Sequence, residues 1–388
     1  MLRDADAHAS FLTDLRGFVQ QRLVPQEAQV AETDEVPAEL VAEMAARGLF
    51  GWSIPESYGG AGMTTEELVL AAMELSQCSV AFRARVGTNT GIGSEALVSD
   101  GTEAQKRHWL PRLARGEVTG AFALTEPEAG SDAASLRTTA RRDGDDYVID
   151  GTKCFITNAP IAGLFTLMAR TDPADLSSRG VTAFLVERDM PGLETGPAYR
   201  KMGQAGSPVS ELRLQGCRVP AANIVGGPAR EGQGFKTAMK VLNKQRIHLA
   251  ALCIGPAIRM LRDAVAFVAT RQQFGQALSG FQLVQAMIAD SQTEIHAARA
   301  LVLQTARQRD DGVDVTMEAS MCKFYASEMC GRVADRSVQM LGGYGYIADH
   351  AMERFYRDVR LFRLYEGTSQ IHQLNIARRT LAAAGYSG

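Results

Sequence analysis

The spacing of apolar residues changes twice along this chain, and the order of the changes limits the folds open to it. Residues 1–117 carry helical spacing, for example in the face that contains Phe11, Leu15 and Phe18. Residues 118–226 carry short β-rich runs, such as 164–169 and 181–186, separated by turn signals. Helical spacing returns over 227–388. The pattern predicts an α+β protein with an N-terminal helical domain, a small central β-domain and a C-terminal helical bundle, divided at these limits.

Composition excludes several classes of function. The chain has 388 residues, 46% of them hydrophobic, with a net charge of −3 and no dense basic block, which argues against nucleic acid or an anionic membrane as the main partner. Its six cysteines form no CxxC pair and its six histidines form no HExxH, so we expect free thiols and no metal. The first residues do not resemble a signal or transit peptide, and no apolar run reaches the roughly 20 residues that span a bilayer. We therefore expect a cytoplasmic protein.

The segment from Leu364 to Ile371 is the strongest candidate for a reactive site. It places one carboxylate, Glu366, in an apolar run, and Gly367 and three small polar residues follow. Burial would move the pKa of Glu366 towards working pH, as a general base for a weakly acidic C–H bond requires. Gly367 would end one helix, and Thr368 or Ser369 would cap the next, over 371–381. Taken alone, the same residues also describe a surface glutamate at a helix end.

Four further segments could contact a cofactor, and each has an ordinary structural alternative. Residues 122–132 run from a strand into a turn of small residues, which could cradle a cofactor or be a plain β-turn. Phe155 and Thr157 would face the same side of a strand, as a ring wall or as core. Arg271, followed by Gln282, could bind a pyrophosphate or be solvated. The glycines of 339–346 would allow close backbone approach or merely break a helix.

Together these segments resemble the motifs of one family. LTEPEAGSD at 124–132, FITN at 155–158, RQQFG at 271–275, QMLGGYGY at 339–346 and YEGTSQI at 365–371 resemble the flavin and active-site motifs of the acyl-CoA dehydrogenases, in order and at matching spacing. The resemblance extends over essentially the whole chain. It implies an FAD-dependent α,β-dehydrogenation of an acyl-CoA to the trans-2-enoyl-CoA, with electrons passed to electron-transfer flavoprotein. It also implies a homotetramer built as a dimer of dimers.

The resemblance implies roles for individual residues. Glu366 matches the base that removes the α-proton while the β-hydride passes to flavin N5, and its backbone N–H and a ribityl hydroxyl would hold the thioester carbonyl. Gln245 stands where some members carry their base, but it is not ionisable. The positions that match the flavin site are Phe122, Leu124, Thr125, Ser131, Phe155 (usually Trp in the family) and Thr157. The positions that match the ADP site, which in the family comes partly from a neighbouring subunit, are Arg271, Phe274, Gln282, Gln339, Gly342 and Gly343. Thr368 and Gln370 match the remaining contacts with the cofactor.

The substrate-binding positions are predicted on the same basis. They are Ser131, Asn243, Arg246, Gly367, Arg378 and Arg83. Arg83 falls where glutaryl-CoA dehydrogenases bind the distal carboxylate of their substrate, although Ser76 replaces a glutamate of that subfamily. An arginine facing the acyl tail would favour an acidic substrate; the alternative is that Arg83 is solvated or salt-bridged. His372 and Lys153 are expected to be exposed and to have no role in the chemistry.

Three other functions stay open at this stage. An acyl-CoA oxidase-like enzyme would pass electrons to oxygen, and an acyl-carrier-protein-linked dehydrogenase would use the same catalytic residues. A non-catalytic flavin-bearing relative that binds nucleic acid would need a basic domain, and this chain is acidic overall.

Overall fold

The N-terminal part of the computed structural model, which describes residues 2–386, is helical. Two helix starts follow from local sequence: Thr64 and Glu67, and Thr102 and Gln105, form reciprocal capping boxes. The helices are α1 (Ala5–Phe18), α2 (Glu27–Thr33), α3 (Ala38–Ala46), α4 (Thr65–Leu75), α5 (Val80–Gly87), α6 (Glu95–Asp100) and α7 (Glu103–Ala114).

The central part is a seven-stranded sheet with the order β1-β4-β2-β3-β7-β6, in which β5 also pairs with β4. Every residue of β4 is buried, in agreement with its mostly apolar sequence, LFTLMAR. β2 and β3 form an antiparallel hairpin, whereas β1 and β4 are parallel. The strands are β1 (Gly120–Ala123), β2 (Thr139–Asp143), β3 (Asp146–Thr157), β4 (Leu164–Arg170), β5 (Val181–Glu187), β6 (Leu193–Thr195) and β7 (Val209–Pro220).

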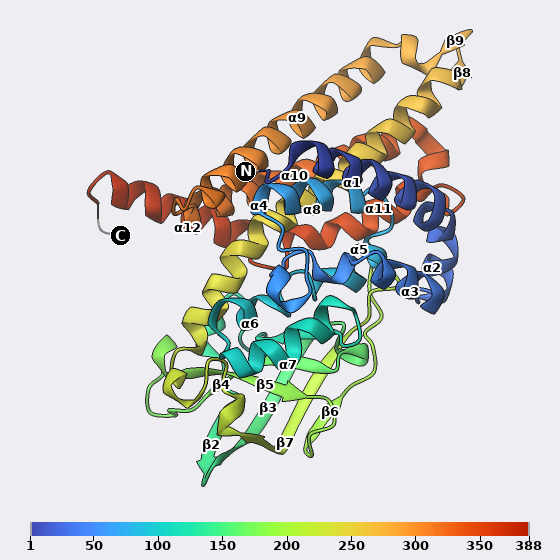
Figure 1. Ribbon diagram of the computed structural model, residues 1–388. Coiled ribbons are helices and arrows are strands. Elements are labelled where there is room, and N and C mark those ends of the chain that lie inside the picture. Colours follow the sequence, from blue (N-terminus) through green and yellow to red (C-terminus); the bar gives the residue numbers. More distant parts are fainter. Residues whose placement is uncertain (1, 387–388) are drawn as a thin grey trace.

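The C-terminal part is a helical bundle organised around one long helix. α8 (Gly234–Thr270) begins against β5 and then packs on α4, α9 and α10. At 1.5 Å per residue it is about 55 Å long, and Figure 1 shows it running from the sheet to the tip of the molecule. A two-stranded hairpin, β8 (Gln272–Gln273) and β9 (Gln276–Ala277), stands at that tip. The remaining helices are α9 (Gln282–Asp310), α10 (Thr316–Leu341), α11 (Ala351–Val359) and α12 (Ser369–Ala383).

The predicted order of helical, β and helical parts is confirmed, while the domain limits stay predictions. Apolar residues that recur at helical spacing over 284–302 lie on the side of α9 that packs on the bundle core, where Ile295, Ala298 and Val302 are buried. Apolar periodicity did not predict the β8–β9 hairpin, because both strands are short and made mostly of polar, exposed residues. Within residues 2–386, no helix combines the length and the apolar character that crossing a membrane requires.

Candidate active site

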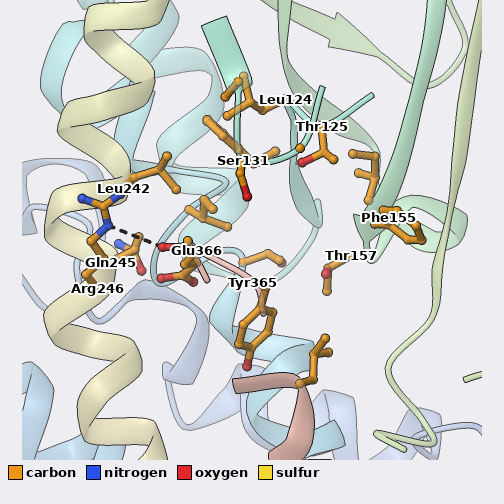
Figure 2. A pocket seen from close by; sticks show the side chains of 18 of the residues that line it. Leu124, Thr125, Ser131, Phe155, Thr157, Leu242, Gln245, Arg246, Tyr365 and Glu366 are labelled. Atoms are coloured by element: carbon orange, nitrogen blue, oxygen red, sulfur yellow. Dashed lines mark hydrogen bonds between the residues drawn. The ribbon is translucent and has the colours of Figure 1, made fainter. Parts of the chain in front are cut away.

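One cavity of about 400 Å³ lies where the β-domain, α5, the start of α8 and the segment before α12 meet. Figure 2 shows Glu366 on one side of this cavity and Thr125, Ser131 and Thr157 of the β-domain on the other. Four segments that are far apart in the sequence thus form one site.

Glu366 reaches the cavity through an unusual backbone conformation. Its φ is +54°, and that of Gly367 is +99°, so two successive residues lie in the region that L-residues avoid. A strained non-glycine residue of this kind is typical of functional sites. Its carboxylate oxygen Oε2 is buried and has no hydrogen-bond partner among the described residues. Burial raises the pKa of Glu366, and the nearby cations Arg83, Lys323 and Arg246 oppose that rise.

The segment after Glu366 is fixed by caps and side chains. Thr368 is the N-cap of α12 and accepts a hydrogen bond from the Ile371 N–H at 3.3 Å, so the predicted cap is confirmed. The Ser369 hydroxyl donates to Glu328 Oε1 at 2.6 Å. His372 lies beneath Gly367, because a Cβ on Gly367 would approach His372 Nε2 to 2.9 Å. The turn therefore has no room for a side chain at position 367.

The β-domain wall carries the residues that were predicted to contact a planar ring: Phe122, Leu124, Thr125, Ser131, Phe155 and Thr157 all line the cavity. The turn after β1 is tied to β3, since the Cys154 N–H donates to the Thr125 carbonyl at 2.9 Å. Phe155 has φ +58° beside an irregularity in the β3–β7 register and is 68% exposed. The wall therefore offers an aromatic side chain and hydroxyl groups on one surface.

The prediction that Lys153 and His372 are exposed was wrong, because both are 0% exposed. Lys153 points under the turn after β1 and donates to Glu126 Oε1 at 2.6 Å and to the Leu124 carbonyl at 3.2 Å. Burial lowers the pKa of Lys153 to about 8 and that of His372 to about 3. Sequence spacing gave no sign of the burial of Lys153, because it depends on Glu126 from another segment.

Arg83 is neither ion-paired nor fully solvated. It projects from α5 into the cavity, its Nε atom is buried without a hydrogen-bond partner, and no carboxylate of residues 2–386 lies within ion-pair distance. Arg85, two residues further on, donates to Thr119 Oγ1 at 2.8 Å instead. Gln245 also lines the cavity with an unpartnered Nε2 atom. The cavity lining therefore includes polar donors that have no partner among the described residues.

Arg246 connects α8 to the Glu366 turn. Its Nη1 donates to Asn243 Oδ1 at 2.8 Å and its Nε to the Glu366 carbonyl at 3.4 Å, the contact drawn in Figure 2. Asn243 itself borders a second, smaller cavity that Arg309 and Thr316 also line. Arg378 and Gln370 are exposed on α12, and neither they nor Thr368 line the main cavity.

The residues predicted for the ADP half of the cofactor do not reach the main cavity. They lie around the β8–β9 hairpin, the start of α9 and the end of α10, at the opposite end of α8 (Figure 1). The Arg271 guanidinium lies 5.5 Å from the centre of the Tyr344 ring, and Phe274 is 94% exposed. Along α8, Arg246 and Arg271 are separated by about 37 Å. In a single chain, the residues predicted to bind the two halves of the cofactor therefore lie in two distant places. The flavin positions lie at the cavity, and the positions for the ADP half lie at the tip: Arg271, Phe274, Gln282, Gln339, Gly342 and Gly343.

Two residues near the base were missed. Tyr365 lines the cavity, and its buried hydroxyl has no hydrogen-bond partner among the described residues. Lys323, on α10, donates to the Gly367 carbonyl at 2.6 Å and is 0% exposed. The available signal for Lys323 was a lysine on the apolar face that Ala319, Cys322 and Ala326 form. Among residues 2–386, no group of three His, Cys, Asp or Glu side chains could hold a metal ion.

Comparison with known proteins gives matches over almost the whole chain. Family models described as the acyl-CoA dehydrogenase N-terminal, middle and C-terminal domains match residues 5–117, 121–217 and 232–381. An acyl-CoA dehydrogenase of Bacillus subtilis is 40% identical over 95% of this chain and 96% of its own. An acryloyl-CoA reductase (NADH) of Anaerotignum propionicum is 42% identical over 94% of this chain and 92% of its own. The structure of butyryl-CoA dehydrogenase from Megasphaera elsdenii superposes with a TM-score of 0.93 at 34% identity, covering 98% of this chain and 100% of that one.

Proposed function

The chain belongs to the acyl-CoA dehydrogenase family of flavin-dependent oxidoreductases that act on CH–CH groups, and from this premise we propose that it oxidises an acyl-CoA thioester to the trans-2-enoyl-CoA with Glu366 as the base. The observation that carries the proposal is the position of Glu366. Its partly desolvated carboxylate stands across one cavity from the aromatic and hydroxyl groups of the β-domain wall. A base and a ring-binding wall therefore face the same space.

The β-domain wall fits the isoalloxazine of FAD. Phe155 offers an exposed aromatic side chain, and Thr125, Ser131 and Thr157 offer hydroxyls to ring nitrogens and oxygens. When bound, the flavin would supply the two-electron acceptor that no amino-acid side chain provides. The wall thus agrees with the flavin that the family implies and supports FAD as its form.

The chain's own residues would prepare the substrate and remove the proton. A raised pKa makes the Glu366 carboxylate a stronger base than an exposed glutamate, and the carboxylate must be ionised to act. The Glu366 N–H would donate to the thioester carbonyl and stabilise the negative charge that develops there. Arg246 would hold the Glu366 peptide group by donating to its carbonyl oxygen. The tight turn at Gly367 would keep the carboxylate and this N–H on the same side.

The distant positions at the tip support a shared cofactor site. Because Arg271 lies about 37 Å along α8 from Arg246, we propose that the tip of one subunit holds the ADP half of the FAD whose flavin lies in a neighbouring subunit. Phe274 is 94% exposed at this tip, as a residue that contacts another chain would be. A homotetramer built as a dimer of dimers would provide this arrangement.

The cavity presents polar donors, which favour an acyl group with a polar or acidic tail. The unpartnered atoms Arg83 Nε, Gln245 Nε2 and the Tyr365 hydroxyl all border it. An alkyl tail would leave these donors unpaired at a cost of about 1–3 kcal/mol each, whereas a carboxylate could accept from Arg83. Ser131 and Gly367, which line the cavity, would contact the rest of the thioester, and Asn243 would act through Arg246, to which it is bonded. Arg378 is exposed on α12 outside the cavity, so its position gives no support for its predicted role in substrate binding.

The 42% identity to an acryloyl-CoA reductase supports a second candidate, in which the same site runs in the reducing direction. The base and the oxyanion donor serve both directions, because a forward and a reverse reaction share one transition state. Electron-transfer flavoprotein is the proposed electron acceptor, and oxygen is the alternative acceptor. An acyl group on an acyl-carrier protein is the alternative substrate. Nucleic-acid binding without catalysis is the alternative function.

The test is anaerobic addition of butyryl-, isovaleryl-, octanoyl- and glutaryl-CoA to the purified flavoprotein, following the absorbance of the oxidised flavin. We expect bleaching by at least one thioester, loss of bleaching in Glu366→Gln, and full bleaching in Glu117→Gln, an exposed control. Reoxidation of the bleached protein by crotonyl-CoA, by electron-transfer flavoprotein or by oxygen would then identify the direction and the electron partner. No bleaching by any acyl-CoA in a flavin-loaded protein would contradict the proposal.

A further inference from the structure

The turn that carries Glu366 needs an external support. Glu366 has φ +54°, a strained conformation for a residue with a side chain, and such a conformation persists only where the surroundings impose it. Gly367 follows at φ +99°, which glycine adopts without strain. The Arg246 contact to the Glu366 carbonyl is long, at 3.4 Å. A shorter contact, 2.6 Å, joins Lys323 Nζ to the Gly367 carbonyl. Of these two side chains, Lys323 therefore makes the shorter contact with the backbone of the turn.

Lys323 is an unusual residue in its own right. It is 0% exposed on the core face of α10, and among residues 2–386 no carboxylate lies within ion-pair distance of its ammonium group. A buried cation without a paired anion is costly, so a structural role alone would be served better by an apolar side chain. Burial lowers its pKa to about 8, which leaves the group cationic at neutral pH. The charge itself is therefore a candidate for function.

The electrostatic surroundings of Glu366 come from several elements. The group closest to it in sequence is Tyr365, and the others come from α5, α8, α10 and α12. The titratable and charged groups that face Glu366 are Tyr365, Arg83, Arg246, Cys253, Lys323 and His372. Cys253, Tyr365 and His372 are neutral at pH 7, because burial raises the pKa of Cys253 to about 12, raises that of the Tyr365 hydroxyl well above its ordinary value and lowers that of His372 to about 3. Among residues 2–386, the groups that act on the Glu366 carboxylate as charges are therefore Arg83, Arg246 and Lys323.

We propose that Lys323 is a positioning residue for Glu366, holding the strained turn through the Gly367 carbonyl and stabilising the ionised carboxylate by its charge. The inference rests on the proposed role of Glu366 as the base. Of the three cations, Arg83 lines the cavity, and Arg246 is already bonded to Asn243. Lys323 approaches from the protein side, beneath the turn, where a bound substrate does not compete for its hydrogen bonds.

Three substitutions separate the charge from the hydrogen bond. Lys323→Met removes both, and it should fold because an apolar side chain of similar volume replaces an unpaired buried charge. Lys323→Gln removes the charge but keeps a donor, and Lys323→Arg keeps the charge. Cys330→Ala is the control, since Cys330 is a buried residue of the same helix. Each of these variants is also made with Glu366→Gln, and the spectrum of that double variant is subtracted to isolate the signal of Glu366.

The first readout is the protonation of Glu366 in the flavin-loaded protein, followed by the infrared band of its carboxyl group that disappears in the Glu366→Gln blank. We expect the midpoint of this titration to rise by about one pH unit in Lys323→Met and Lys323→Gln. It should stay at the wild-type value in Lys323→Arg and Cys330→Ala. Unchanged midpoints in the two neutral variants would overturn the electrostatic half of the proposal.

The second readout is the pH profile of flavin bleaching by the acyl-CoA that reduces the wild-type protein. Its acid limb should move upward with the infrared midpoint, and its plateau should fall by about tenfold or more in Lys323→Met, because the turn loses its support. Lys323→Gln should keep more of the plateau. A plateau in Lys323→Met equal to that of Cys330→Ala would overturn the positional half. If no acyl-CoA bleaches the wild-type protein, the proposed function fails, and the infrared titration still decides the role of Lys323.

Discussion

Lys153 and Glu126 form an ion pair that is sealed from solvent behind the proposed flavin wall. The Lys153 ammonium, 0% exposed, donates to Glu126 Oε1 at 2.6 Å. The same carboxylate accepts from the backbone N–H groups of Arg137 and Thr138, at 2.6 and 3.0 Å. One buried anion therefore joins the turn after β1, the approach to β2 and strand β3. These are the segments that carry Thr125, Ser131 and Phe155.

We predict that Lys153→Met destabilises the protein by about 3–5 kcal/mol, because it leaves the Glu126 carboxylate buried without its partner. It should also accelerate release of the flavin. The double variant Glu126→Gln/Lys153→Met should recover most of the stability. Thermal unfolding and flavin fluorescence would measure both effects. Arg115→Met, which breaks the exposed pair with Glu117, is the control and should leave the Tm unchanged; equal losses in the two variants would contradict the prediction.

The raised pKa of Glu366 predicts a pH-dependent effect on stability. Since the folded state binds this proton more tightly than the unfolded state, ionisation of Glu366 disfavours folding as the pH rises above its ordinary pKa of 4.5. Glu366→Gln should therefore unfold at a higher temperature than the wild type at pH 8, and the difference should vanish towards pH 4.5. Thermal scans of the flavin-loaded proteins across this range would measure it. A constant difference at all pH values would show that Glu366 is not desolvated as described.

Arg83 is predicted to determine the preference for the acyl tail. Replacing it by methionine should lower kcat/KM for glutaryl-CoA about 10- to 100-fold relative to butyryl-CoA, because the tail carboxylate loses a charged donor. Arg85→Met, on the same helix but bonded to Thr119, should leave the ratio unchanged. Steady-state rates with both thioesters give the ratio. A ratio that stays constant in Arg83→Met would remove Arg83 from the substrate site.

Gly367→Ala is predicted to disrupt the base turn. Alanine at φ +99° is strained, and its Cβ would lie 2.9 Å from His372 Nε2. We expect a large loss of the bleaching rate and a lower Tm. Gly312→Ala is the matched control, because Gly312 has φ +80° but nothing within 4 Å of the added carbon, so only the backbone cost of about 1–2 kcal/mol applies. Similar bleaching rates in the two variants would argue against a close fit at Gly367.

A mixing experiment tests whether neighbouring subunits share the cofactor site. Arg271→Glu should weaken flavin binding, and Glu366→Gln should abolish bleaching, so neither homomer reacts. Co-expressed, the two variants should form mixed oligomers in which an intact Arg271 of one subunit completes the Glu366 site of its neighbour. Partial recovery of bleaching is therefore expected. If Arg271 served its own subunit, the mixture would stay inactive.

The sequence predicted the elements that depend on neighbouring residues or on the spacing of apolar residues. β4 is mostly apolar and is buried throughout, and the Thr368 side chain caps α12 because a hydroxyl at that position can accept from the first turn. The base segment and the cavity-lining residues 122–131 were identified together because the family motifs name them. These parts needed no knowledge of distant contacts.

The features that were missed depend on pairs from different elements. The burial of Lys153 requires Glu126 from another segment, and the contact of Lys323 with Gly367 requires the crossing of α10 beneath the turn. Arg83 could equally have been solvated, since nothing next to it in the sequence shows that α5 points it into a cavity. A buried charge is visible in a sequence only when its partner is also recognised.

The uninterrupted course of α8 also restricts how the length of this chain could change. Each residue inserted in the helix between Arg246 and Arg271 would turn everything beyond it by about 100° and advance it by about 1.5 Å. One added residue would thus point the hairpin and its arginine to a different side of the molecule, while the cavity at the other end stayed the same. Seven added residues would restore the direction almost completely but displace the tip by about 10 Å. The helix therefore fixes both the distance and the relative direction of the cavity and the tip. We expect insertions and deletions to be tolerated in the surface loops and not along this segment.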